Sequence, residues 1–312
     1  MNPYWGKGFF AFFRLFWERL LSGEAFTSPV SDELQLFALF GISIAGSLVG
    51  TFLVLRRMTM LANSLSHTMI LGIIAIFLIT GNFSLNLGSL LIAAFVTALL
   101  TALLTHTLSH TAKLQEDASI GLVFTSLFAV GIVLITLFTR DAHVGTEVVL
   151  GNLEILESND LFLIGVSATI DIILFFLFYK EFKLSTFDPL LATTMGISRT
   201  VFGSLLMILT SITVVAAFRA VGVLLVLAFL VAPPLIGRLW THRLLPLLFL
   251  SAAAGILCSL LGVALSRHFL STHHLPLSTA GIVVTLLGLL FALSALTLSP
   301  RNSLIYRRKW KA

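Results

Sequence analysis

The stretch LQLFALFGISIAGSLVGTFLVL occupies residues 34–55 and is followed directly by Arg56 and Arg57. It contains no charged side chain, and as a helix it is long enough to cross the roughly 30 Å hydrocarbon core of a membrane. Lipid offers no partners for backbone groups, so such a segment is stable there only as a helix. The stretch therefore predicts a membrane-spanning helix whose arginine-bearing end faces the cytoplasm.

The same pattern recurs along the rest of the chain. Further apolar segments cover 60–80, 85–108, 119–138, 161–179, 200–218, 220–237, 244–265 and 277–298. The sixth and seventh segments are separated only around Arg219. The chain is 58% hydrophobic and 11% charged, whereas soluble domains are about 25% charged, so a water-soluble globule is excluded. We predict an all-α polytopic membrane protein, a bundle of eight to nine transmembrane helices.

The charged residues predict the orientation of this bundle. Most of the 19 Lys and Arg residues lie in loops on the same side as Arg56, and most acids lie on the other side. Positive residues mark the cytoplasmic side, so the N-terminus is expected outside, and residues 301–312 form a basic cytoplasmic tail. The net charge of +5 therefore reflects topology, and no nucleic acid partner is expected. The acidic outer face either suits a partner or cations, or holds acids only because basic residues avoid it.

Residues 1–33 form an extension ahead of the first span. Its segment 9–21 is rich in aromatic side chains but is interrupted by Arg14, Glu18 and Arg19. It is too short to span a membrane, and its charges argue against a signal peptide. We expect an interfacial amphipathic helix that lies on the membrane surface.

Three groups of residues inside the spans need an explanation. Asn63 and His67 lie one helical turn apart on one face, which suits either a transient site for a divalent cation or hydrogen bonds between helices. Asp171 is a functional candidate because carboxylates are costly in lipid, although Ser167 or a neighbouring helix could satisfy it. Pro233 and Pro234 indicate a gate or a plain structural kink.

Two kinds of site are excluded because the sequence lacks the residues that they need. The sequence has no G-x-x-x-x-G-K-[ST] motif, so this chain does not bind ATP in a P-loop. Its single cysteine, Cys258, rules out a disulfide within the chain and a thiolate metal cluster.

Several motifs together resemble the ABC-3 family, the permease subunits of manganese, zinc or iron ABC importers. They are ANSLSHTMILG at 62–72, QEDASIG at 115–121, FDPLLATTMGI at 187–197 and AVGVLLVLAFLVAPPLIGRL at 220–239, with LFALSALTLSPR at 290–301. The resemblance covers about residues 34–305 and is specific only when the motifs are taken together.

The resemblance implies a type II importer permease domain over 34–300. In such importers two permease subunits enclose a path, cytoplasmic ATPases drive alternating access, and an extracytoplasmic protein delivers the metal. It implies a bacterial plasma membrane protein that transports Mn, Fe or Zn, binds no cofactor stably and is not itself an enzyme.

The motif at 187–197 corresponds to the helix that couples to the ATPase. Phe187 opens it, Asp188 caps a helix that Pro189 starts, and Gly196 ends it. In the motif at 62–72 the family usually has Asp where this chain has Asn63, a weaker ligand, while His67 is retained. One hypothesis is therefore that a second, non-identical permease supplies the carboxylate.

Three alternatives stay open. A siderophore or vitamin B12 permease has a related fold but carries larger cargo. A proton-coupled secondary transporter would work through Asp171 and His67, and a structural scaffold would bind no ATPase. If Phe187→Ala or Gly196→Glu left transport intact while Asp171→Asn abolished it, proton coupling would be favoured over the ABC importer.

Overall fold

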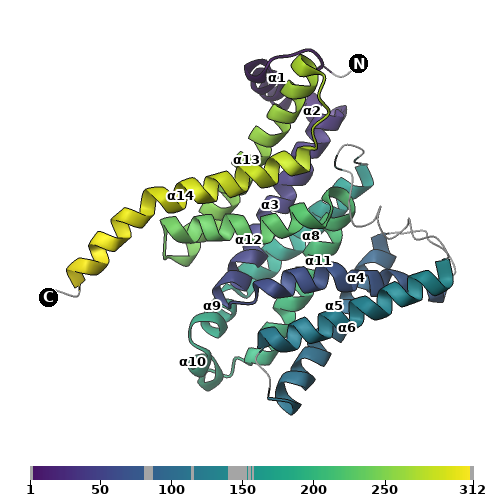
Figure 1. Cartoon of the computed structure of the whole chain (residues 1–312), viewed down its shortest axis with the longest axis vertical. Coiled ribbons are helices and arrows are strands. Elements are labelled where there is room, and N and C mark those ends of the chain that lie inside the picture. The colour runs from purple at the N-terminus through teal and green to yellow at the C-terminus, as the bar shows by residue number, and fades with distance from the viewer. Residues whose placement is uncertain are drawn as a thin grey trace.

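The structure is a computed structural model that describes residues 3–80, 87–113, 116–139, 153, 156 and 158–309. Every helix or strand assigned in these ranges is a helix (Figure 1). The long ones are α3 (Ser31–Leu55), α4 (Thr59–Thr80), α5 (Leu87–Thr111), α6 (Glu116–Thr139), α8 (Ser158–Leu177), α11 (Arg199–Val221), α12 (Val223–Trp240), α13 (Leu244–His273) and α14 (Thr279–Lys309). The short ones are α1 (Phe9–Ser22), α2 (Glu24–Thr27), α9 (Tyr179–Phe187) and α10 (Pro189–Thr194).

The helices agree with the predicted spans. In the described ranges, seven helices are long and apolar enough to cross a membrane, namely α3, α6, α8, α11, α12, α13 and α14. The remaining two predicted spans, 60–80 and 85–108, correspond to the long helices α4 and α5. The chain is therefore a multi-pass membrane protein. Helix α3 starts at Ser31 rather than 34, and α14 continues to Lys309, so most of the predicted tail is helical.

The boundary between α11 and α12 differs from the prediction. Arg219 lies inside α11, and the break falls at Gly222, where φ is 79° and ψ is 166°. This left-handed φ is one that glycine adopts at no steric cost. A single residue therefore separates the two helices. The charge of Arg219 suggested a helix boundary at that residue. The boundary instead falls where glycine permits a left-handed φ.

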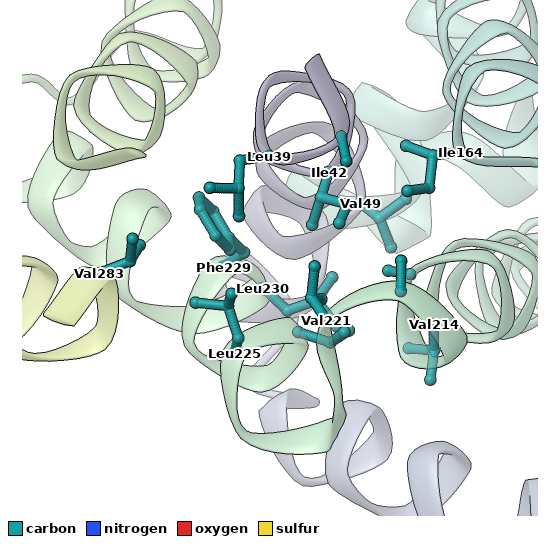
Figure 2. Close-up of a cluster of buried hydrophobic side chains, with 14 of the residues drawn as sticks. Leu39, Ile42, Val49, Ile164, Val214, Val221, Leu225, Phe229, Leu230 and Val283 are labelled. Carbon is teal, nitrogen blue, oxygen red and sulfur yellow. The ribbon is translucent and has the colours of Figure 1, made fainter. Parts of the chain in front are cut away.

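Helix α3 lies at the centre of the core and packs against α8, α12 and α13. In Figure 2, Leu39 of α3 lies beside Phe229 of α12, while Val49 lies on the side of Ile164 of α8. The polar side chains of α3 join the same packing, since Ser43 Oγ donates to a backbone carbonyl of α13 at 3.0 Å.

The backbones of α3 and α12 meet at two glycines. A Cβ on Gly50 would lie 2.8 Å from the carbonyl carbon of Leu230, and one on Gly46 would lie 3.4 Å from Phe229 O. These carbonyls stand four residues before Pro233 and Pro234, which have no N–H to donate to them. Small residues let membrane helices approach this closely. The prolines thus lie buried in an uninterrupted α12, beside the glycine face of α3.

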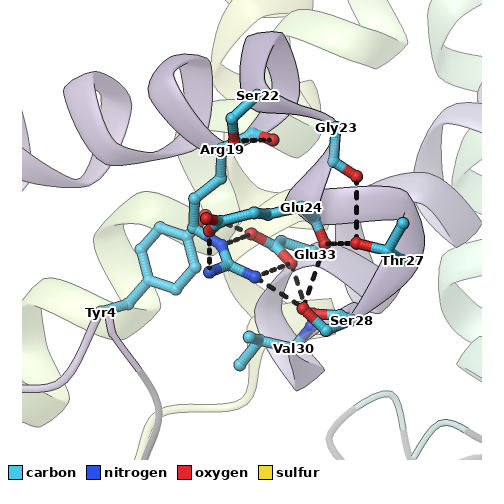
Figure 3. A network of polar contacts seen from close by, with 9 residues as sticks. All are labelled: Tyr4, Arg19, Ser22, Gly23, Glu24, Thr27, Ser28, Val30 and Glu33. Carbon is cyan, nitrogen blue, oxygen red and sulfur yellow. Dashed lines mark hydrogen bonds and ion pairs between the residues drawn. The ribbon is translucent and has the colours of Figure 1, made fainter.

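The N-terminal extension is attached to α3 by a buried carboxylate (Figure 3). Glu33 Oε1 accepts from Arg19 Nε at 2.6 Å and from the Tyr4 hydroxyl at 2.8 Å, and Glu33 Oε2 accepts from Val30 N at 3.0 Å. Glu33 is 0% exposed. Burial and the Glu33 hydrogen bond raise the pKa of Tyr4, so its hydroxyl stays protonated and donates. Phe12 and Phe16 of α1 are buried as well, so the extension is part of the folded protein.

Replacing Glu33 with Ala is expected to destabilise the protein by about 3 kcal/mol, because the Arg19 guanidinium, with its side chain only 15% exposed, loses its main partner. The matched control is Glu18→Ala, which removes a 2.8 Å pair with Arg14 that is largely exposed. Exposed pairs contribute roughly 0–1 kcal/mol. Thermal unfolding of the purified protein in detergent measures both. Equal midpoints for the two variants would show that the cluster does not hold the extension.

Candidate functional site

The segment predicted to couple to an ATPase forms a short capped helix. α10 begins at Pro189, and Asp188 Oδ1 accepts a 3.0 Å hydrogen bond from Leu191 N. After its last turn, Gly196 has a φ of +78°, in the left-handed region that favours glycine. The predicted cap, start and end of this helix are therefore confirmed as local structure.

Helix α9, which leads into α10, is anchored to the bundle. The Phe182 ring is fully buried, 4.7 Å from the ring of Phe175 in α8 and 5.5 Å from that of Phe52 in α3. Arg56, at the end of α3, donates from Nη2 to Ser185 Oγ of α9 at 2.7 Å. Helix α9 is thus in direct contact with both α3 and α8.

Helix α10 presents an apolar surface at its end of the bundle. Leu190 is 81% exposed, Met195 62%, Phe187 55% and Leu191 46%, whereas Ala192 is buried. Figure 1 shows α10 at the end of the bundle away from α1 and α2. Large apolar side chains are thus grouped on and next to α10 at this end of the bundle.

The predicted polar pair lies on α4. Asn63 and His67 are one turn apart on this helix, and their side chains lie outside the described part of the chain. Each directly precedes a buried hydroxyl residue, Ser64 and Thr68 respectively. Gly72, one turn further, lies so close to α5 that a Cβ would be 3.0 Å from a backbone carbonyl of that helix. Gly72 therefore lies at a tightly packed seam between α4 and α5.

A stripe of hydroxyls continues this seam along α5. Thr97, Thr101 and Thr105 recur at four-residue spacing, and all three are buried. The hydroxyls of Thr101, Thr105 and Ser64 have no hydrogen-bond partner among the described residues. Buried hydroxyls without partners are costly, so the stripe is a candidate polar lining. It was not singled out from the sequence, although the threonine spacing is visible there.

Asp171 is fully buried between α8 and α11. Thr213 Oγ1 of α11 donates to Asp171 Oδ2 at 2.6 Å, and Oδ1 has no partner among the described residues. Ser167 instead donates to Ile164 O at 2.9 Å. Of the two partners considered from the sequence, the neighbouring helix is therefore correct. Because α11 also packs against α4, this helix links Asp171 to the polar seam.

The described polar groups are spread along the bundle. In the part of the chain that the structure describes, no three His, Cys, Asp or Glu side chains are grouped as metal ligands. The described helices contain a buried carboxyl group and several buried hydroxyls. The oxygens of these groups are weak ligands for a cation.

The apolar helices, with polar groups buried among them, define a polytopic membrane protein. The model of the ABC 3 transport family matches residues 35–298. The chain belongs to this family.

Relatives cover nearly the whole chain. A "Probable metal transport system membrane protein" of Chlamydia muridarum is 37% identical over 99% of this chain and 98% of its own length. The manganese transport system membrane protein MntD of Bacillus subtilis is 38% identical over 86% of this chain and 92% of its own. The zinc transport system membrane protein TroD of Treponema pallidum is 34% identical over 88% of this chain and 76% of its own length.

Solved structures support the fold. PsaBC from Streptococcus pneumoniae, in complex with Fab, aligns with a TM-score of 0.72 at 24% identity, over 87% of this chain and 93% of that chain. An inward-facing metal-chelate type ABC transporter aligns with a TM-score of 0.57 at 14% identity, over 88% of this chain and 85% of that chain.

Proposed function

We propose that this chain is the membrane-spanning permease subunit of an ATP-binding cassette importer that carries a divalent metal ion, Mn, Fe or Zn, into the cytoplasm. The observation that carries the proposal is full-length similarity to metal transport membrane proteins, with 38% identity to a manganese system and 34% to a zinc system. The chain is a transport subunit rather than an enzyme.

The partners follow from this assignment. Cytoplasmic ATPase subunits dock on α10, whose exposed Leu190 and Met195 supply an apolar contact. A second permease subunit, identical or not, completes the path, and an extracytoplasmic metal-binding protein delivers the ion. The permease holds no cofactor stably, since the metal is its cargo.

The ion route runs along polar groups in the helices. His67 and Asn63 on α4 provide the transient contacts, with the adjoining hydroxyl stripe as further weak ligands. Asp171 on α8 supplies a buried carboxyl oxygen, and α11 packs between this helix and α4. Weak oxygen and imidazole ligands suit passage, because a strong closed site would not release the ion.

The chain lies in the bacterial plasma membrane with its N-terminus outside and its C-terminus in the cytoplasm. If each of the nine long helices in the described residues, α3 to α14, crosses once, the two ends lie on opposite sides, which supports this orientation. Helix α1 rests on the outer surface as an interfacial helix, because Phe10, Trp17 and Leu21 are exposed on it while its other face is buried. Trp and Phe favour this boundary.

ATP-dependent uptake of Mn, Fe and Zn into liposomes by the purified complex tests the function. We expect one of these metals to accumulate only with ATP, and His67→Ala to reduce its uptake at least tenfold, because a ligand on the route is lost. His273→Ala, an exposed residue at the end of α13, is the control and should leave uptake unchanged.

Two outcomes would contradict the proposal. Uptake that needs a proton gradient rather than ATP would place the chain among secondary transporters. An absence of any co-purifying ATPase would favour a scaffold. The same preparation also counts the permease species, and a single one would exclude the non-identical second permease.

A further inference from the structure

A cavity of about 420 Å³ lies where α3 ends and α11 begins. Arg56, Arg57 and Arg199 line it, together with hydroxyl residues such as Ser109 and Thr200. No acidic side chain is among the described residues of its wall. The cavity therefore combines three guanidinium groups with hydrogen-bonding hydroxyls.

The backbone at Arg57 shows how one of these cations is placed. Arg57 has a φ of 61°, and Met58 N donates to Leu53 O at 2.8 Å, which together form a Schellman cap at the end of α3. Glycine usually occupies this position because other residues are strained there. Here the strained position carries an arginine, so the end of α3 brings a charge to the cavity wall.

Arg56 is held in the wall by α9. Its Nε donates to Thr186 Oγ1 at 3.0 Å and its Nη2 to Ser185 Oγ at 2.7 Å. Its Nη1 faces α11, where a Cβ on Gly203 would lie 3.8 Å from it. The guanidinium is thus fixed in orientation between α9 and α11.

The cavity lies at one end of the bundle. Its wall is formed by the ends of the membrane helices α3 and α11, by the last turns of α5 and by Pro189 of α10. Basic pockets between membrane helices on the cytoplasmic side bind anionic headgroups. The volume lies within the range of about 300–1,000 Å³ that small-molecule sites occupy.

We propose that this cavity binds a phosphate group, carried by the headgroup of an anionic phospholipid or present as free phosphate. Guanidinium groups bind phosphate through paired N–H donors, and the hydroxyls add further donors. Three positive charges repel a divalent cation, so the cavity is not itself an ion site, although Thr105 of the hydroxyl stripe also lines it. The bound headgroup lies against α10 and so touches the segment proposed to couple to the ATPase.

Thermal unfolding of the purified complex in detergent tests the site, with phosphatidylglycerol, phosphatidylcholine or inorganic phosphate added separately. A ligand that binds only the folded state raises the unfolding midpoint. We expect phosphatidylglycerol to raise it and phosphatidylcholine not to. The double variant Arg57→Gly/Arg199→Gln should weaken the apparent affinity at least tenfold.

Two variants keep the result interpretable. Arg57→Gly alone fits the cap without strain, so without lipid its midpoint should equal or exceed that of the wild type, while its response to phosphatidylglycerol falls. Arg243→Gln removes an exposed arginine of the α12–α13 loop and should respond as the wild type does. An equal loss in Arg243→Gln, or an equal response to phosphatidylcholine, would overturn the proposal. A response to inorganic phosphate alone, with the same loss in Arg57→Gly, would support the phosphate site and identify free phosphate as its ligand.

Discussion

Gly50→Ala is expected to destabilise the folded permease strongly and to lower metal uptake with it. The added Cβ would lie 2.8 Å from the Leu230 carbonyl carbon and 3.0 Å from Leu230 Cα. These are backbone atoms and cannot move without shifting α12 away from α3. Overpacking costs about 1–3 kcal/mol where the neighbouring side chains can move aside. The neighbours of Gly50 are backbone atoms, which cannot. We expect at least about 3 kcal/mol, or roughly a hundredfold shift in the folding equilibrium.

The matched control is Gly165→Ala on α8, where nothing lies within 4 Å of the added Cβ. Its unfolding midpoint should stay at the wild-type value. Thermal unfolding in detergent and the yield of monodisperse protein compare the two variants. If Gly50→Ala unfolds at the same temperature as Gly165→Ala, the close contact of α3 and α12 is not essential.

Leu190→Glu is expected to uncouple transport without disturbing the permease. Leu190 is 81% exposed on α10, so the protein alone tolerates a charge there. In a complex the same carboxylate would be buried against the ATPase without a partner, which is costly. We expect about a hundredfold weaker association with the ATPase and loss of ATP-dependent uptake.

Leu190→Met is the control, because it keeps an apolar side chain of similar volume and should retain both activities. Co-purification of the ATPase and uptake are measured for each variant, with thermal unfolding as the check on folding. Normal uptake by a well-folded Leu190→Glu protein would mean that the ATPase contacts another part of the chain.

Local features were the most predictable from the sequence. Apolar length alone located the spans, because a membrane helix must satisfy its own backbone. The caps of α10 followed from Asp188, Pro189 and Gly196, since these residue types act on the adjacent backbone. The break between α11 and α12 was placed at Arg219 instead of Gly222, because charge reports on topology and not on the backbone angles.

Contacts between distant segments were not predictable in this way. Thr213 meets Asp171 across 42 positions of sequence, and apolar periodicity does not say which helices are neighbours. Arg19 looked like an interruption of an amphipathic helix, yet it pairs with Glu33 of α3 at 2.6 Å. Gly50 approaches the backbone of Leu230, which is 180 positions away in sequence.

A guanidinium group forms a hydrogen bond at each end of α3. Arg19 donates to Glu33 at one end, and Arg56 donates to Ser185 of α9 at the other. The 25 residues between its ends rise about 37 Å at 1.5 Å per residue. Helix α3 is therefore one continuous helix that is long enough to span the bilayer. It connects the contact with α9 at one end to the Glu33 cluster of the N-terminal extension at the other.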